Sequence, residues 1–232
     1  MEFSPEGPKA IPLWVNGRAF LTVTESFFDV VNPHSGEAVH RVPLCGAAEA
    51  AEAASAARAA QPAWAALAPE ARQACLDALA DGLDRYAGHF VKLLRGDTGF
   101  PEAQAQDEVA AALAALRGTA VGEAGVVALV VDATRPLAGF AEAAAPILRA
   151  GGAVIVKPSP KAPAAAFALC ELSGRAAWPP GVLNLMQGDT EAIDGLCCGG
   201  IDRLVYAGNA ALGVQVGAIA DAAGKPYVML AS

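Results

Sequence analysis

A single lysine closes a strongly apolar run in the middle of the chain. Residues 151–163 read GGAVIVKPSPKAP, in which branched apolar residues lead up to Lys157. Such residues favour a buried strand, and the proline that follows supplies no amide donor, so the strand must end near Lys157. The sequence therefore predicts an ammonium group at the carboxyl end of a parallel strand, where open α/β sheets bind their ligands. A ligand contact and a solvated strand-ending residue are both consistent with this position.

The other reactive side chains form no recognisable site. Five cysteines occur without a CxxC or Cys/His ligand spacing, and the three histidines are scattered, so we expect free thiols and no metal site. The adjacent pair Cys197-Cys198 has two readings. It could be a redox or nucleophilic site, or it could fill apolar space before the Gly-Gly turn at 199–200.

The composition restricts the partners and the location of the protein. Its 232 residues suffice for one substantial core, and its net charge of −8 argues against a nucleic-acid partner. The opening residues, MEFSPEGPKAIP, lack the basic and apolar regions of a signal peptide. Arg149 and Lys157 interrupt the best candidate for a membrane span. We therefore expect a cytoplasmic protein that does not enter a membrane.

The first part of the chain predicts hairpins followed by helices. Residues 11–45 predict two hairpins, the first around Asn16-Gly17, a strong hairpin turn signal. An alanine-rich helix begins after Gly46, and Pro62 should end or bend it.

Two more helices are expected before residue 120. Pro69 begins one of them, and the other runs from about residue 101 to 117. Apolar residues at three- and four-residue steps give the Pro69 helix one apolar face, formed by Leu76, Leu79, Leu83, Tyr86 and Phe90.

Strands and helices then alternate to the end of the chain. The predicted strands are 125–131, 153–157, 182–186, 202–206 and 227–230. The predicted helices between them are 136–150, 163–177, 190–196 and 209–223. This order is typical of a Rossmann-like, doubly wound parallel sheet of about five strands. We expect one α/β domain over residues 1–232, with the hairpins (11–45) and helices (47–117) packed on the sheet (125–230).

Several fragments occur in an order that resembles one known family. They are LWVNGRAF, FDVVNPHSGEAVHRVP, GVVALVVDATRPL, GGAVIVKPSP, WPPGVLNLMQG and LVYAGNAALG. Together they resemble the N-terminal, cofactor-binding half of the NAD(P)-dependent aldehyde dehydrogenase superfamily, almost from end to end of this chain.

The resemblance implies an NAD(P) site that has lost part of its polar contacts. In the family, the lysine and the glutamate of a KPSE motif hold the hydroxyls of the adenosine ribose. Lys157 and Ser159 match the lysine and the serine of this motif, but Pro160 occupies the position of the glutamate. The family's FTGS segment brings backbone and a helix N-terminus close to the pyrophosphate. Here it reads YAGN, so the implied cofactor-binding residues are Lys157, Ser159, Gly208, Asn209 and Gly213. Asn209 has a second reading, as the cap of the helix that follows it.

The resemblance also implies that the catalytic positions have been lost. Thr134 stands where the family has the asparagine that stabilises the oxyanion, and Ala231 stands at the glutamate general base. We expect the family's nucleophilic cysteine to fall beyond Ser232, since no cysteine here matches its segment. Truncation cannot explain Thr134 or Pro160, so we expect a domain without catalytic residues of its own.

Three functions follow from these observations. The first is a non-catalytic partner that assembles with itself or with a catalytic homologue. The reason is that the last strand, YVML, is apolar on both faces. The interface would include residues 11–45 or the helix 209–223. The second is an NAD(P)-binding or sensing module that uses Lys157, Ser159 and Gly208. The third is a divergent aldehyde oxidoreductase that uses Cys197 or Cys198.

Overall fold

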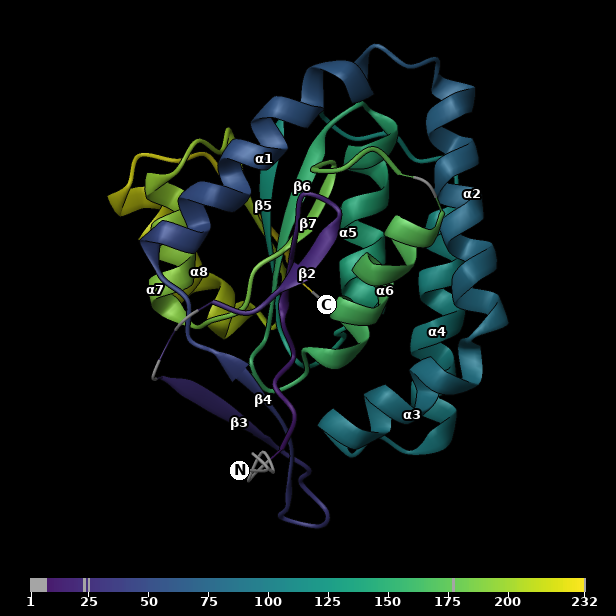
Figure 1. Ribbon diagram of the computed structural model, residues 1–232, viewed down its shortest axis with the longest axis vertical. Helices are drawn as coiled ribbons and strands as arrows, with labels where there is room; N and C mark the ends of the chain where they lie inside the picture. Colours follow the sequence, from purple (N-terminus) through teal and green to yellow (C-terminus); the bar gives the residue numbers. More distant parts are fainter. Residues whose placement is uncertain (1–7, 23, 25, 177, 232) are drawn as a thin grey trace, which may run out of the picture.

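A seven-stranded sheet runs through the centre of the molecule, with helices on both faces (Figure 1). The computed structural model describes residues 8–22, 24, 26–176 and 178–231. The parallel strands are β5 (Val126–Val131), β6 (Ala153–Pro158), β7 (Leu183–Leu185), β8 (Arg203–Gly208) and β9 (Tyr227–Ala231). The sheet order is β2-β1-β7-β6-β5-β8-β9, which confirms the predicted doubly wound α/β fold.

The two N-terminal hairpins have different places. The first consists of β1 (Leu13–Val15) and β2 (Arg18–Phe20), and both residues of its Asn16-Gly17 turn have positive φ, as that turn requires. We expected this hairpin to pack on the sheet, but it extends the sheet, because Trp14 pairs antiparallel with Leu185. The second hairpin, β3 (Phe27–Val31) and β4 (Ala38–Pro43), forms a separate two-stranded sheet.

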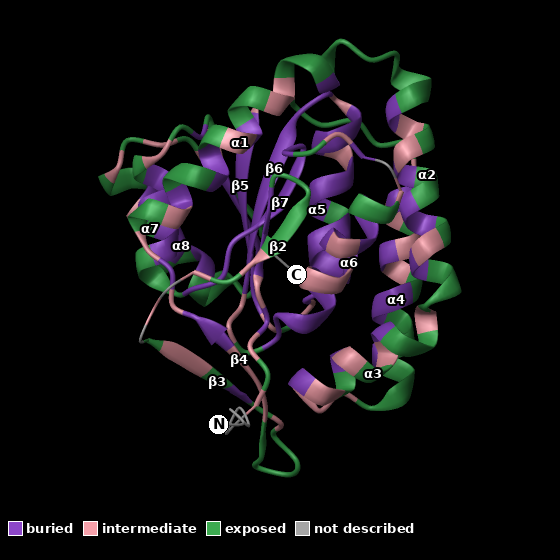
Figure 2. Cartoon of the chain, viewed as in Figure 1, coloured by how far each residue is buried: buried purple, intermediate pink, exposed green. Residues whose placement is uncertain are grey.

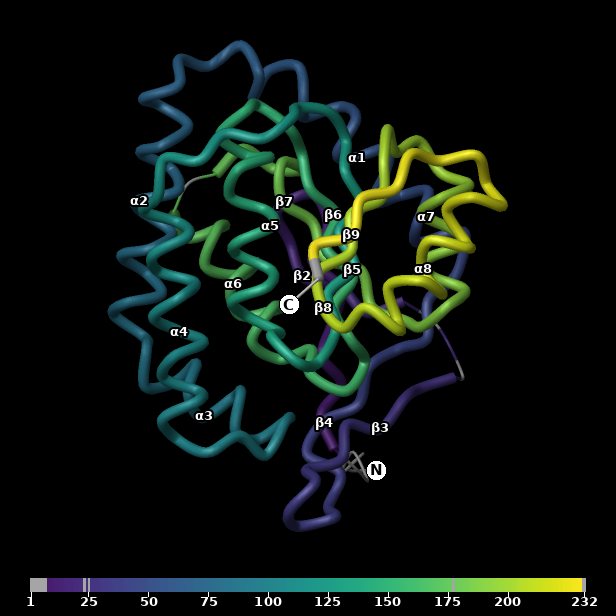
Figure 3. Tube along the Cα trace, turned by 180° about the vertical axis from the view of Figure 1, so that it is seen from behind, coloured from purple at the N-terminus to yellow at the C-terminus, as the bar shows by residue number. Residues whose placement is uncertain are grey.

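Eight helices in the described part of the chain cover the two faces of the sheet. They are α1 (Ala47–Ala65), α2 (Pro69–Arg85), α3 (Ala87–Thr98), α4 (Glu102–Arg117), α5 (Ala138–Arg149), α6 (Ala164–Arg175), α7 (Thr190–Cys198) and α8 (Ala210–Ala222). Helices α1, α7 and α8 lie on one face, and α5 and α6, backed by α2, α3 and α4, lie on the other (Figures 1 and 3). None of these helices is both long and apolar enough to cross a membrane.

The central strands are buried on both sides, as parallel strands between helical layers must be (Figure 2). Successive residues of β5 point to opposite faces. Leu129 packs into the core under α5, whereas its neighbour Ala128 packs into the core under α1, α7 and α8. The predicted strand 125–131 therefore separates two cores, and only its ends can carry a functional side chain.

The observed helices differ from the predicted ones in several details. Of the two effects expected of Pro62, an end of the first helix is excluded, since α1 continues through Pro62 to Ala65. The predicted Pro69 helix breaks at Tyr86, whose φ of −106° and ψ of 18° leave helical geometry, so that α2 and α3 are separate helices. Tyr86 is exposed and does not belong to the apolar face. The predicted helix 163–177 ends as α6 at Arg175, and residue 177 lies outside the described residues.

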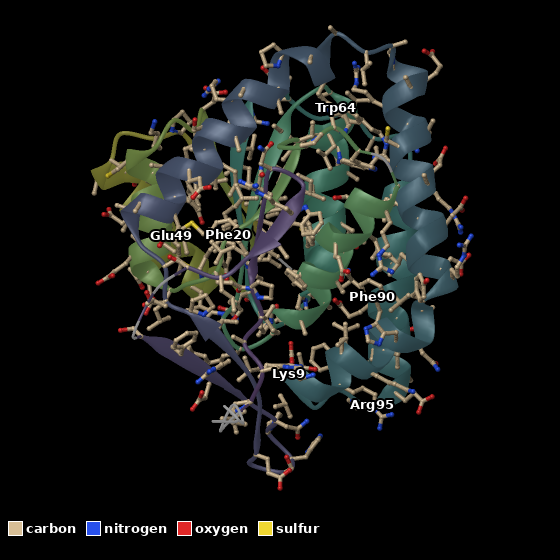
Figure 4. The ribbon with its side chains drawn as sticks, in the orientation of Figure 1. Lys9, Phe20, Glu49, Trp64, Phe90 and Arg95 are labelled. Carbon is tan, nitrogen blue, oxygen red and sulfur yellow. The ribbon has the colours of Figure 1, made fainter. Side chains whose placement is uncertain are left out.

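One aromatic contact joins the first helix to the sheet layer. Trp64, labelled in Figure 4, is fully buried near the end of α1 and stacks on Trp178, with ring centroids 5.3 Å apart. Its indole Nε1 donates a hydrogen bond of 2.9 Å to the carbonyl of Leu148 on α5. The buried polar end of the tryptophan is thus satisfied, and α1 is fixed across the end of the sheet.

Two buried carboxylates from α3 and α4 cap the helices next to the sheet. Glu108 Oε2 accepts hydrogen bonds from the amides of Leu137 (3.1 Å) and Ala138 (2.9 Å) at the start of α5. Asp97 Oδ2 accepts one from Ala164 (2.9 Å) at the start of α6. Neither α5 nor α6 has a capping side chain of its own. These carboxylates supply the missing acceptors and oppose the positive ends of the helix dipoles.

Candidate functional site

A cavity of about 270 Å³ opens at the carboxyl end of the parallel strands, between α7 and α8. Strands β5, β6 and β8 each contribute a residue near their carboxyl ends or directly after them. Apolar side chains from the two helices, including Ile193, Leu212 and Val216, form its walls. The polar groups that line the cavity are Asp132, Lys157, Ser159, Asp189, Thr190, Tyr206 and Gln215. A mostly apolar cavity with a few polar groups is the general form of a small-molecule site.

Lys157 reaches this cavity from the end of β6, as its sequence position predicted. It pairs with Val130 of β5 and is 4% exposed. Within the described parts of the chain its ammonium donates no hydrogen bond, and burial lowers its pKa to about 8, an effect that the Asp189 carboxylate partly opposes. A buried ammonium without a hydrogen-bond partner can donate to a ligand oxygen in the cavity.

Asp132 directly follows β5 and is the most highly connected group of the site. Its Oδ1 accepts hydrogen bonds from the amide (2.8 Å) and the hydroxyl (2.5 Å) of Thr134. Its Oδ2 accepts from the hydroxyl of Tyr206 (3.1 Å) and the amide of Asn209 (2.7 Å). Burial, and then the Asp132 charge, raise the pKa of Tyr206, so the phenol stays protonated as the donor. The carboxylate is 6% exposed and is held between β5, β8 and the start of α8.

The end of β8 and the start of α8 fit around this carboxylate. Gly208 has φ +149°, and a Cβ there would collide with Asp132 Cγ. Asn209 accepts a hydrogen bond from the Ala211 amide (2.8 Å) and so caps α8, the second of its two predicted roles. A Cβ at Gly213 would collide with Met229 of β9. In this structure both glycines therefore make room for other side chains of the same chain.

The five predicted cofactor-binding residues thus separate into two groups. Lys157 and Ser159 line the cavity. Gly208, Asn209 and Gly213 lie next to it, with the packing and capping roles described above. Sequence reasoning missed Asp132, Asp189 and Tyr206 as cavity residues. An aspartate immediately after an apolar strand, as in VVALVVD, is the signal that could have found Asp132.

The two halves of the cavity differ in how they suit a dinucleotide. Lys157 and Ser159 can bind sugar hydroxyls, but Pro160 offers no side-chain acceptor beside them. The start of α8 is the kind of helix terminus that binds phosphates. Its Asn209 amide already donates a hydrogen bond to the Asp132 carboxylate. The residues present therefore fit a sugar or nucleoside, and they do not fit a diphosphate at α8.

The side chains that the sequence suggested for catalysis either lie away from the cavity or already donate hydrogen bonds within the chain. The Thr134 hydroxyl donates to Asp132 and is not free to stabilise an oxyanion. Thr190 begins α7 at the cavity, whereas Cys197 and Cys198 end the same helix, about 12 Å further along it. Burial raises the pKa of Cys197 to about 11, which keeps it a thiol. Among the described residues, no three His, Cys, Asp or Glu side chains are grouped to hold a metal ion.

Comparison with known proteins gives one consistent result. A model of the aldehyde dehydrogenase family matches residues 20–123 and 121–231. The 3,6-anhydro-alpha-L-galactose dehydrogenase of Streptomyces coelicolor is 30% identical over 198 residues, which cover 76% of this chain and 40% of that protein. The glutarate-semialdehyde dehydrogenase of Pseudomonas putida is 28% identical over 228 residues, which cover 88% of this chain and 48% of that protein.

Solved structures of the same family share the fold. The indole-3-acetaldehyde dehydrogenase of P. syringae, whose structure is a complex with NAD+, superposes with a TM-score of 0.88 at 25% identity. The superposition covers 98% of this chain and 52% of that one. This chain spans about half the length of the curated relatives that it matches. The chain belongs to the aldehyde dehydrogenase family.

Proposed function

We propose that this chain is a non-catalytic member of the aldehyde dehydrogenase family that works by association, with a second copy or with a catalytic homologue. The observation that carries the proposal is the hydrogen bond between Thr134 and Asp132. Thr134 occupies the position that the resemblance assigns to the oxyanion donor. Because its hydroxyl and its amide both donate to Asp132, neither can stabilise a developing negative charge.

An exposed apolar surface supports the association. We call it the β9/α8 surface, and it consists of Val228, Met229, Leu230, Leu212 and Val214, which are between 40% and 66% exposed. Strand β9 is also an edge of the seven-stranded sheet, beside α8 (Figure 3). Val228 and Leu230 lie on one face of this edge strand and Met229 lies on the other, against Gly213 of α8, so apolar side chains are exposed on both faces of the sheet edge. An exposed apolar edge strand is typical of a contact with another chain. A cytoplasmic location is part of this proposal, and five free thiols support it.

An activity assay tests the absence of catalysis. We expect the purified chain to show no oxidation of short aldehydes with NAD+ or NADP+, because the oxyanion donor is engaged and Cys197 remains a protonated thiol. The Cys198→Ser variant is the control, since Cys198 is the exposed cysteine. Turnover by the wild type that this variant abolishes would establish a catalytic cysteine and refute the proposal.

Lys157 favours a second candidate function, that of a nucleotide-binding or sensing module. The side chain of Lys157 is largely buried, and its ammonium lines the cavity without a hydrogen-bond partner in the described residues, so it is free to donate to a ligand oxygen. NAD(P) is the ligand class that the family resemblance suggests. Calorimetric titration of the wild type and of Lys157→Ala tests this function, and binding that the variant does not weaken would contradict it.

A further inference from the structure

The Asp132 carboxylate occupies the place where a helix N-terminus would otherwise meet a phosphate. It lines the cavity and accepts the hydrogen bond of the Asn209 amide at the start of α8. A second amide of this helix start, that of Ala211, donates to the Asn209 side chain. Two donors that could bind an oxyanion are therefore already satisfied by groups of this chain.

The position of this carboxylate is fixed on three sides. Tyr206 of β8, Thr134 of the loop after β5 and the backbone of Asn209 all donate to it. Gly208 leaves no room between the carboxylate and the β8 backbone, because even a Cβ would collide with it. A ligand cannot displace Asp132 without breaking several hydrogen bonds to a buried charge, each worth more than an ordinary one.

Lys157, on the strand next to Asp132, offers a different chemistry. It pairs with Val130, two residues before Asp132, and its ammonium donates no hydrogen bond in the described residues. Ser159 lies two residues further on, and the other walls of the cavity include the apolar side chains of Ile193, Leu212 and Val216. Such a cavity suits an apolar ring that carries hydroxyl groups, provided that no negative charge approaches Asp132.

We propose that Asp132 is a specificity-determining residue that makes this cavity select an uncharged nucleoside over a ligand with a phosphate or diphosphate. The carboxylate occupies the start of α8, where it accepts the hydrogen bond of the Asn209 amide and repels a ligand anion. This inference rests on one part of the second candidate function above, ligand binding at Lys157, and it changes the ligand class of that function from a nucleotide to an uncharged nucleoside. It does not depend on association through the β9/α8 surface.

The test compares adenosine with NAD+, two probes that share a nucleoside and differ in the diphosphate. Calorimetry is carried out on the wild type and on Asp132→Asn, which removes the charge at nearly constant size. We expect the wild type to bind adenosine more tightly than NAD+. In Asp132→Asn the affinity for NAD+ should rise by at least about tenfold, whereas the affinity for adenosine should change by less than about twofold.

A matched control separates charge from loosened structure. Thr134→Val removes a donor to the same carboxylate and leaves the charge in place. It should not raise the affinity for NAD+. Thermal melts of both variants establish that they are folded, and if Asp132→Asn does not fold, Asp132→Ala replaces it.

Three results would overturn the inference. One is a wild type that binds NAD+ more tightly than adenosine. The second is an equal gain in NAD+ affinity in both variants, which would show that loosening and not charge is responsible. The third is a folded Asp132→Asn protein with no gain for NAD+. If adenosine binding is also absent from the wild type and Lys157→Ala changes nothing, ligand binding at Lys157 fails as a function as well.

Discussion

Lys157 places a positive charge at a largely buried position where no described residue accepts a hydrogen bond from it. Burial lowers its pKa to about 8 from the ordinary 10.5, so the folded chain releases this proton at a lower pH than the unfolded chain does. Between these two values the unfolded state binds more protons, and stability rises with pH. Below about pH 8 both states are charged, and the full cost of the buried ammonium is present.

The Lys157→Met variant tests this cost. At pH 7 it should be more stable than the wild type by up to about 3 kcal/mol, and the difference should shrink as the pH rises from about 8 toward 10.5. Denaturant unfolding at several pH values measures it, and comparison of the two proteins cancels the titration of the cysteines. Lys161→Met, at an exposed lysine, is the control and should keep the wild-type profile. A stability difference that does not depend on pH would contradict the account.

The two main residues of the site were not equally predictable. Lys157 could be identified from its own neighbours, because an apolar run and a proline locate the end of a strand. The place of Asp132 after an apolar strand could be found in the same way, but its hydrogen bonds could not, since its partners Tyr206 and Asn209 follow 74 and 77 residues later in the chain. The resemblance assigns Gly208 to a cofactor contact, and this stays a prediction; the structure adds that the glycine leaves room for Asp132. The contact between Gly208 and Asp132 depends on the packing of β5 against β8, which no local pattern contains.

At the scale of elements, helices α5 and α6 depend on carboxylates from other helices. Asp97 of α3, which caps α6, is buried, and burial raises its pKa to about 7. Its second carboxylate oxygen lies 3.8 Å from His40 Nε2. Glu108 of α4, which caps α5, accepts hydrogen bonds from two amides, and burial also raises its pKa. These contacts join α3 and α4 to the layer next to the sheet, and so they connect residues 87–117 to the strands that carry the site.

Removing the Glu108 cap should destabilise the chain. Glu108→Ala leaves two amides of α5 without their acceptor, and we expect a loss of about 1–2 kcal/mol in the free energy of unfolding. Glu142→Ala is the matched control. Glu142 also pairs with Arg135 but is exposed and caps no helix, so its loss should cost less than about 0.5 kcal/mol. Equal losses in the two variants would show that the ion pair matters and the cap does not.

The order of strands and helices was predictable because each element shows its own periodicity. The hairpin 13–20 was predictable from its turn, but its addition to the sheet was not, since that depends on the single distant pairing of Trp14 with Leu185. The break at Tyr86 was hidden for a similar reason. The apolar spacing of Leu83, Tyr86 and Phe90 runs across it without interruption, and only the packing of α3 against α4 and α6 turns the chain there.

At the scale of the whole molecule, the β9/α8 surface is one of the apolar parts that stay exposed. Both faces of the central strands are buried, whereas within the described residues β9 pairs with β8 and keeps three apolar side chains exposed. Solvent contact of these residues costs free energy that a contact with another chain would recover. Leu230→Glu introduces a charge into this surface, which should disrupt association and leave the folded chain intact.

Light scattering during gel filtration, at micromolar concentration, tests the association most directly. We expect the wild type alone to show twice the mass of one chain, or, when it is mixed with a catalytic member of the family, a complex whose mass is the sum of the two different chains. Leu230→Glu should return the mass to that of one chain, whereas Val121→Glu, a charge at an exposed valine outside the surface, should not. A wild type that stays a monomer both alone and in the mixture would contradict the proposal that this protein works by association.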